Sequence, residues 1–214
     1  LINASKAGAL LTVRPDYDPE EERLTLAFPG GRVVTGEAAT RGRAIVTSFF
    51  GRPVAAHVVE GPWAAALSEH LGRSVVLARC DQPGSGYDDS SVSIVSTASL
   101  DELFAAAMEQ RLDFRRFRTL VEVAGCRPRE EDLWCGRHVR LGAVTVAVRA
   151  QIVRCVVTTL NPETGARDFE TLRSIRQLRR ADPFHTNCLG VYAEVVTPGW
   201  LRTGDPVEVL EPVP

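Results

Sequence analysis

Short runs of alternating apolar and polar residues, separated by Gly, Pro and Asp, dominate the chain. An RLTLAF run and an RVVTG run flank Pro-Gly-Gly, which predicts a hairpin because glycines favour tight reversals between strands. About a dozen such runs favour barrels or curled sheets over a regular alternation of strands and helices. The remaining runs cover 44–49, 54–59, 75–78, 92–95, 120–123, 138–141, 144–148, 154–159, 191–196 and 206–210.

Three segments have helical spacing instead. In GPWAAALSEHLG, Trp63, Leu67 and Leu71 share one face between Pro62 and Gly72, which suit the first turn and the end of a helix. SLDELFAAAMEQ opens with a capping box from Ser99 to Glu102. Its apolar stripe consists of Leu100, Leu103, Phe104, Ala107 and Met108. DFETLRSIRQLRRADP begins at Asp168 as a cap and ends in a basic turn before Pro183.

The stretch CDQPGSGYDDSS, 80–91, is the densest in Gly, Pro, Ser and Asp, and so predicts a boundary. We place one domain over 1–80 and a second over 81–214. The chain begins at Leu1 rather than Met, and we expect a preceding segment to be missing.

Composition and charge exclude several classes of function. The 214 residues are 44% apolar and 24% charged, with a net charge of -2 and no long run of one sign. This balance indicates a globular protein without a nucleic-acid groove or a cationic membrane face. No apolar run approaches the roughly 18 residues of a membrane span. The five cysteines contain no Cys-x-x-Cys pair, which argues against a disulfide framework or structural zinc. We expect reduced thiols in a soluble, cytoplasmic protein.

Cys155, in the stretch VRCVVTTLNPETG, has two interpretations. It is either a buried cysteine in a hairpin or a thiolate that acts as a ligand or nucleophile. In a strand, Arg154 and Cys155 point to opposite faces, so the neighbouring arginine need not touch the sulfur. The turn from Asn161 to Gly165 predicts a rigid reversal that would hold the cysteine-bearing strand in a fixed place.

Arginines and a helix start raise a second possibility. Arg115, Arg116 and Arg118 are either solvated, or one of them turns inward to hold a phosphate or carboxylate. The VSTAS segment before the second helix could receive an anion at the helix N-terminus. His185 and Cys188 offer a weaker metal-binding pair. Glycine patterns of hydrolases, NTPases and dinucleotide-binding proteins are absent from the sequence.

Taken in order, the motifs of the second half resemble the MOSC family, named for the C-terminal domain of molybdenum cofactor sulfurases. The resemblance spans Val92 to Leu210. It rests on VSIVSTASLDEL, DFRRFRTLVEVAG, REEDLWCGRHVRLGAVTV, RCVVTTLNPETG and LGVYAEVVTPGWLRTGDPVEVL. The first half, with LLTVRP, LTLAFPGG and GPWAAALSEHLGRSVVLAR, looks like the N-terminal β-barrel that accompanies MOSC domains.

The resemblance implies a β-rich α+β fold, with a MOSC β-barrel, a few short helices and a smaller N-terminal barrel-like region. It implies a molybdenum cofactor (molybdopterin) lying between the two domains, without a requirement for pyridoxal phosphate. In the family's amidoxime-reducing branch, the residue matching Cys155 ligates molybdenum. The residue matching Arg118 contacts the phosphate side of the cofactor, and Ser96 and Thr97 match the same pocket. We add Thr119 and Arg154 as cofactor-binding candidates.

The sequence also departs from the family pattern. Thr119-Leu120 replaces Pro-Asn, Gln151 replaces an upstream cysteine, and Val153 replaces a polar residue. The family's Tyr-Pro-Val-Lys-Ser and Thr-x-Arg segments do not occur in these 214 residues.

Three functional hypotheses follow. The first is a molybdenum oxidoreductase that reduces small N-oxygenated substrates with electrons from a separate donor protein, since the chain has no heme or iron–sulfur motif. The second is a sulfur carrier or sulfurtransferase with a persulfide on Cys155. The third is a binding module that recognises cofactor or a partner without turnover, and this last case allows the cofactor to be absent.

Overall fold

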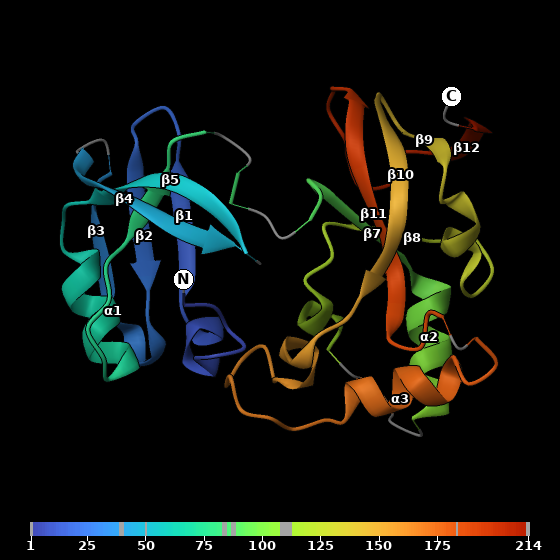
Figure 1. Cartoon of the computed structure of the whole chain (residues 1–214), viewed down its shortest axis with the longest axis horizontal. Coiled ribbons are helices and arrows are strands. Elements are labelled where there is room, and N and C mark those ends of the chain that lie inside the picture. The colour runs from blue at the N-terminus through green and yellow to red at the C-terminus, as the bar shows by residue number, and fades with distance from the viewer. Residues whose placement is uncertain are drawn as a thin grey trace. The chain divides into compact units, whose positions relative to one another are not determined.

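The computed structural model describes residues 2–38, 41–49, 51–82, 85–86, 89–107, 113–182 and 184–212. Backbone contacts divide the chain into two compact units (Figure 1). Unit 1 comprises Leu1–Asp88 and Leu160–Arg167, and unit 2 comprises Asp89–Thr159 and Asp168–Pro214. The division from contacts therefore lies a few residues beyond the one drawn from the sequence, and it assigns one short segment of the second half to unit 1.

The described residues of unit 1 form two three-stranded antiparallel sheets and one α-helix. The expected hairpin forms: β2 pairs with β3 across the Pro29–Gly31 turn, with Thr25 opposite Thr35. The sequence does not reveal β1, because all five of its residues are exposed and carry no apolar alternation. The elements of unit 1 are β1 (Arg14–Asp18), β2 (Arg23–Ala27), β3 (Val33–Glu37), β4 (Arg41–Phe49), β5 (Arg52–Val59), α1 (Trp63–Leu71) and β6 (Ala78–Cys80), with the 3₁₀ helix η1 (Gly8–Thr12).

Helix α1 begins after Pro62 and ends at Gly72, as the sequence predicts. Gly72 adopts a left-handed conformation with φ +61°, which lets its N–H cap the last turn. Trp63 is fully buried, and its indole N–H donates to the Leu24 carbonyl at 3.1 Å. A Cβ at Gly61 would lie 2.3 Å from the Trp63 ring, so the helix packs where only glycine leaves room.

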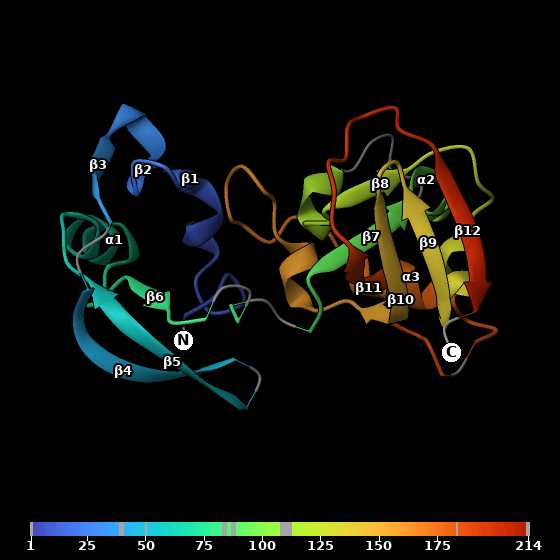
Figure 2. The same cartoon turned by 90° about the horizontal axis from the view of Figure 1, so that it is seen from above.

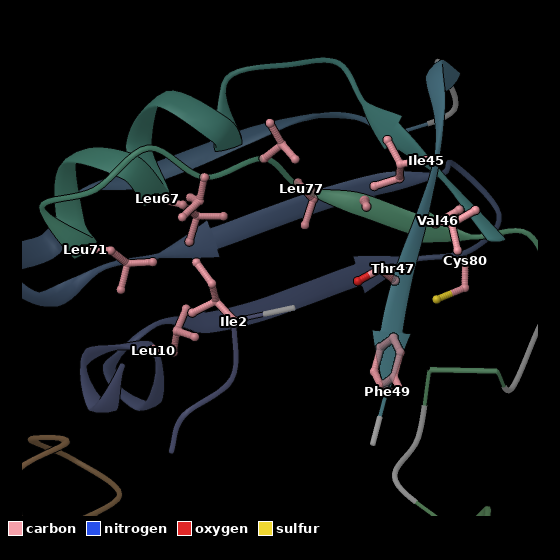
Figure 3. Close-up of a pocket in the computed structure, with 14 residues that line it drawn as sticks. Ile2, Leu10, Ile45, Val46, Thr47, Phe49, Leu67, Leu71, Leu77 and Cys80 are labelled. Carbon is pink, nitrogen blue, oxygen red and sulfur yellow. The ribbon is translucent and has the colours of Figure 1, made fainter. Parts of the chain in front are cut away.

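A cavity of about 540 Å³ lies within unit 1, between α1, β4 and the segment 75–80, which includes β6 (Figure 3). Its walls are almost entirely apolar and include Ile45, Phe49, Leu67 and Leu71. Thr47 and Cys80 supply the polar side chains among its described lining residues. Because these walls carry no formal charge, the cavity does not suit an anionic cofactor.

Unit 2 contains one six-stranded sheet in the order β12-β9-β10-β11-β7-β8. All neighbouring strands are antiparallel except β7 and β8, and Figure 2 shows the sheet curling on itself. Irregular register between β10 and β11 accompanies this curvature. The result is the predicted sheet-rich α+β fold with few helices. The strands are β7 (Val92–Ser96), β8 (Val121–Val123), β9 (Arg137–Leu141), β10 (Val144–Val153), β11 (Cys188–Thr197) and β12 (Val207–Pro212).

The sheet of unit 2 buries apolar residues on both faces. One cluster includes Ile94, Val139 and Val191 and is closed by Trp134 from the short helix η4 (Glu130–Trp134). The other includes Val95, Leu103 and Ile175, where α2 (Thr97–Ala106) and α3 (Thr171–Leu178) cover the sheet. The two layers fix the strand ends that carry the candidate site residues.

Both helices of unit 2 start elsewhere than the sequence suggests. Ser96, not Ser99, caps α2, and Glu102 pairs with Arg129 at 3.0 Å instead of closing a capping box. Helix α3 begins at Thr171, whereas Asp168 accepts a hydrogen bond from Arg116 at 3.1 Å. Met108 and Pro183 lie outside the described residues. None of the helices in the described ranges is long and apolar enough to cross a membrane.

The strand expected over 154–159 is wrong. β10 ends at Val153, and Val156–Thr159 forms the 3₁₀ helix η5. The Thr158 hydroxyl donates to the Cys155 carbonyl at 2.9 Å, and the Thr159 hydroxyl donates to the Val156 carbonyl at 2.7 Å. These local hydrogen bonds occupy backbone carbonyls that would otherwise pair with a neighbouring strand. They favour the 3₁₀ helix over the strand that the β-branched residues of this segment predict.

The reversal expected at Asn161–Gly165 does form, as part of unit 1. The Asn161 side chain accepts the backbone N–H groups of Glu163 and Thr164, at 2.8 and 3.2 Å. Gly165 has φ +69°, and a Cβ there would lie 2.3 Å from the Gly8 carbonyl oxygen. The turn therefore packs against η1, and glycine is required at this close backbone contact.

Candidate functional site

Cys155 lies just beyond the end of β10, between the sheet and η5. It is a free, exposed thiol, whereas Cys80, Cys126 and Cys135 are half-buried and Cys188 is buried. Its backbone is held from behind, because its carbonyl accepts both the N–H and the hydroxyl of Thr158, at 3.2 and 2.9 Å. The structure thus removes the buried-cysteine interpretation and leaves an accessible sulfur on a fixed backbone.

Arg154 points the opposite way and is buried, with 8% of its surface exposed. Its Nε donates to the Leu189 carbonyl at 2.8 Å, and one terminal nitrogen donates to the Phe117 carbonyl at 2.8 Å. The other terminal nitrogen donates to the Thr119 hydroxyl at 3.4 Å. Arg154 is predicted to contact the cofactor, but its side-chain N–H groups donate to acceptors within the protein.

Burial lowers the pKa of the Arg154 guanidinium to about 10, which leaves it protonated at neutral pH. Within the described residues it contacts no carboxylate, because all three of its acceptors are neutral. The other buried arginines do have such partners: Arg116 contacts Asp168 at 3.1 Å, and Arg179 contacts Asp132 at 2.6 Å. The charge next to Cys155 is thus the one buried arginine charge in the described ranges without an acid.

Arg118 and Thr119 follow the 3₁₀ helix η3 (Phe114–Phe117). Arg118 has a left-handed backbone, with φ +51°, and an exposed side chain without an ion pair in the described part of the chain. The inward arginine of this segment is Arg116, which also donates to the Thr158 carbonyl at 3.2 Å. Arg116 therefore braces η5, and Arg118 stays available to a ligand.

Ser96 and Thr97 differ in burial and in how accessible their hydroxyls are to a ligand. Ser96 is fully buried, and its hydroxyl accepts the Ser99 N–H at 3.0 Å as the cap of α2. Its backbone N–H donates to the buried carboxylate of Glu131 at 3.1 Å. Thr97 is half-buried, with a long contact of 3.5 Å from its hydroxyl to the Val123 carbonyl. Of the pair, only Thr97 presents surface to a ligand.

Ser96→Ala tests this structural role. Because the cap hydroxyl satisfies a helix N–H and is buried, we expect a loss of about 1–2 kcal/mol in the free energy of unfolding. Urea denaturation followed by circular dichroism measures it. Ser91→Ala, at an exposed position outside any helix or strand, is the control and should leave stability unchanged. A Ser96→Ala protein as stable as this control would contradict the assigned cap.

Arg154 connects most of the predicted site residues. Its contacts join the end of β10, the turn after η3 and the start of β11. A Cβ built on Gly190 would lie 3.2 Å from Arg154 Nη2 and 3.3 Å from the Val95 side chain, directly before Ser96. Arg154 therefore links Cys155 to the Arg118–Thr119 turn. Thr97 does not join this group: it follows the end of β7 beside Val123, whereas Thr119 precedes the start of β8, the strand that runs parallel to β7.

Sequence reasoning missed the residues that support this arrangement. Thr158 accepts two hydrogen bonds at its carbonyl, one from Arg116 and one from the Thr171 hydroxyl at 2.6 Å. Gly190 leaves the space into which Arg154 extends. The paired threonines and the Leu-Gly-Val-Tyr string are visible in the sequence, but their partners lie far away along the chain, so no local pattern identifies them.

Two other places in unit 2 were possible sites. A second cavity of about 540 Å³ is lined by Arg127, Arg129 and Arg179, each of which pairs with an acid. His185 contacts Asp182 at 3.0 Å, and Cys188 is buried, so the weaker metal pair does not assemble. The described residues contain no group of three or more His, Cys, Asp or Glu side chains placed to hold a metal ion.

Comparisons with known proteins identify a family and several relatives. The family model described as "MOSC domain" matches residues 81–208. Mitochondrial amidoxime reducing component 2 of Bos taurus is 35% identical over 127 residues, which is 56% of this chain and 37% of that protein. Mitochondrial amidoxime-reducing component 1 of Mus musculus is 33% identical over 132 residues, 58% of this chain and 38% of that protein. The chain thus spans well under half the length of these relatives.

Among solved structures, the YUAD protein from Bacillus subtilis aligns over 67% of this chain and 71% of its own, with a TM-score of 0.41 and 17% identity. The family assignment does not depend on this likeness. It rests on the model match over residues 81–208, which covers more than half of the sequence and includes every candidate site residue from Ser96 to Cys155. The chain belongs to the MOSC domain family.

Proposed function

We propose that this chain binds a molybdenum cofactor through Cys155 and is a molybdenum-dependent oxidoreductase for small N-oxygenated substrates. The observation that carries the proposal is the exposed Cys155 thiol on a fixed backbone, next to a buried arginine that contacts no carboxylate among the described residues. The names of the relatives, amidoxime-reducing components, support the reaction class.

The residues present suit such a group. A thiolate is a soft ligand for a transition metal, and a metal that arrives in a cofactor with its own sulfur ligands needs few protein ligands. The exposed guanidinium of Arg118 suits a phosphate, which it can contact with two parallel N–H donors. Arg154 adds positive charge behind the site, and Thr119 adds a hydroxyl. When bound, the cofactor supplies two-electron transfer of an oxygen atom from the substrate.

The residues of the chain would do the rest. Cys155 holds the metal, Arg118 anchors the phosphate, and the Arg116 and Thr171 contacts to η5 keep the cysteine backbone in place. We propose a small molecule with an N–O bond as the substrate and a separate electron-donor protein as the source of reducing equivalents.

Metal and pterin content of the purified protein tests the proposal. The protein is made in a host that synthesises the cofactor, and molybdenum is measured by elemental analysis, with pterin fluorescence after oxidation. Near-stoichiometric amounts of both support cofactor binding, and reduction of a model amidoxime with a chemical electron donor supports the reaction class. Absence of molybdenum and pterin would refute it.

A sulfur carrier is the second candidate, and the exposed thiol favours it as well. The apolar side chains of Leu120 and Val153, 70% and 69% exposed, stand where the family pattern has polar residues. In this alternative, the Cys155 thiolate takes a sulfane sulfur atom from a donor persulfide, which leaves as a thiolate. Cyanide-labile sulfur on Cys155 in protein without molybdenum would support it, and a non-catalytic binding module would show neither.

Arg118→Ala tests the phosphate anchor. Charge-assisted hydrogen bonds contribute about 1.5–3 kcal/mol, so we expect cofactor retention to weaken roughly 10- to 100-fold. Molybdenum content after extensive dialysis measures the loss. The control is Arg115→Ala, three residues away on the same turn, where the guanidinium pairs with Asp113. Equal losses in both variants would mean that Arg118 has no specific contact.

A further inference from the structure

The proposed function gives Arg154 only a positive charge behind the site and does not say what its side-chain contacts do. The position of Arg154 directly before Cys155 suggests contact with the ligand, but its guanidinium is buried and its three nitrogens donate to protein acceptors. A role in binding by direct contact would require at least one of these donors to leave its present partner.

The three acceptors belong to different segments. Leu189 lies at the start of β11, and Phe117 and Thr119 flank Arg118 in the turn after η3. The guanidinium carbon also lies 5.4 Å from the centre of the Phe117 ring, a distance suited to a cation–π contact. The planar guanidinium therefore contacts the residues on both sides of Arg118 while its own backbone continues into Cys155.

The surrounding residues restrict the position of the Arg154 guanidinium. The Arg154 backbone N–H donates to the Asn187 carbonyl at 2.9 Å, which fixes the base of the side chain. Gly190, with φ +76°, leaves the space beside Arg154 Nη2 that any larger residue would enter at 3.2 Å. A lysine has one nitrogen and could not reach acceptors in three directions at once.

We propose that Arg154 is a positioning residue, which holds the Arg118–Thr119 turn at a fixed place relative to Cys155 and does not itself contact the ligand. The proposed function supplies the identity of that ligand, so the inference rests on it. The positioning itself is a property of the protein without ligand and can be measured there.

The geometry also explains why an arginine occupies this place despite its buried charge. Main-chain carbonyls at Phe117 and Leu189 would be left without these donors if the residue were apolar. An anion held between Arg118 and Cys155 would compensate the charge that no acid in the described residues compensates.

Hydrogen exchange on the cofactor-free protein tests the proposal directly. The Arg118 amide donates to the Arg115 carbonyl at 3.0 Å, and the Leu120 amide donates to the Ser93 hydroxyl at 3.0 Å, so both are reporters of the turn. In Arg154→Lys we expect their exchange to become roughly tenfold faster, while the Ala107 amide at the end of α2 is unaffected. Unchanged exchange at Arg118 and Leu120 would overturn the proposal.

Cofactor loading separates positioning from direct contact. If Arg154 positions the turn, Arg154→Lys and Arg154→Met lose molybdenum to a similar extent, because neither side chain has a guanidinium that can donate to all three acceptors. Retention in Arg154→Lys and loss in Arg154→Met would show that charge alone matters, and would overturn the proposal. Arg179→Lys, at a buried arginine paired with Asp132, controls for general destabilisation and should load normally.

One further variant keeps the outcome decisive. If Arg154→Lys does not fold, Thr119→Val removes one acceptor at the surface of the turn and should accelerate exchange at Arg118 by a smaller factor. If the wild-type protein itself contains no molybdenum, the proposed function fails, and the exchange experiment still decides whether Arg154 holds the turn.

Discussion

Replacing Cys155 with serine is expected to abolish molybdenum retention and reductase activity while leaving the protein folded. The side chain is exposed, and the contacts of this residue run through its backbone carbonyl, which serine keeps. A serine hydroxyl is not ionised at neutral pH and is a hard donor, so it does not replace a soft thiolate ligand. Stability should change by no more than about 0.5 kcal/mol, as for other surface substitutions.

Three measurements on the same preparations decide this prediction: elemental analysis, amidoxime reduction and urea denaturation. Cys80→Ser is the matched control, because Cys80 is a half-buried free thiol in unit 1 and is not among the residues proposed to bind cofactor. It should retain molybdenum and activity. A Cys155→Ser protein that unfolds, or one that remains active, would show that the cysteine has another role.

Local signals predicted those elements whose ends are set by nearby residues. Helix α1 lies where Pro62 and Gly72 place it, and the β2–β3 hairpin forms across its glycines. Helix α2 was found, but its cap was misplaced, because Ser96 and Ser99 both fit a cap. Tertiary contacts decide between them. The backbone N–H of Arg129 donates to the Ser99 hydroxyl at 2.7 Å, and the Arg129 guanidinium forms an ion pair with the Glu102 carboxylate.

In the candidate site, too, some features follow from the local sequence and others depend on distant residues. Alternation along the chain placed Arg154 and Cys155 on opposite sides, and the structure has one buried and the other exposed, although η5 replaces the expected strand. Which arginine turns inward could not be read from Phe-Arg-Arg-Phe-Arg. The answer depends on Asp168 and the Thr158 carbonyl, which reach Arg116 from positions more than 40 residues away.

Gly190→Ala is expected to be the most destabilising of the substitutions considered, by about 2–5 kcal/mol in the free energy of unfolding. The residue has φ +76°, which strains any side chain, and its Cβ would lie 2.5 Å from the Ile94 carbonyl oxygen. Because that oxygen belongs to β7, β7 and β11 would have to separate to relieve the contact. The same Cβ would press on Arg154, so molybdenum retention should fall even where the protein stays folded.

Gly204→Ala separates backbone strain from the steric contact. Gly204 has φ +93°, but a Cβ there meets nothing within 4 Å, so alanine should cost only the strain of about 1–2 kcal/mol. Urea denaturation of both variants gives the difference that is due to Ile94 and Arg154. If the two glycine variants lose equal stability and retain equal molybdenum, the close approach at Gly190 does not support the site. A larger loss at Gly190, together with weaker cofactor retention, would tie the packing of β7 against β11 to the position of Arg154.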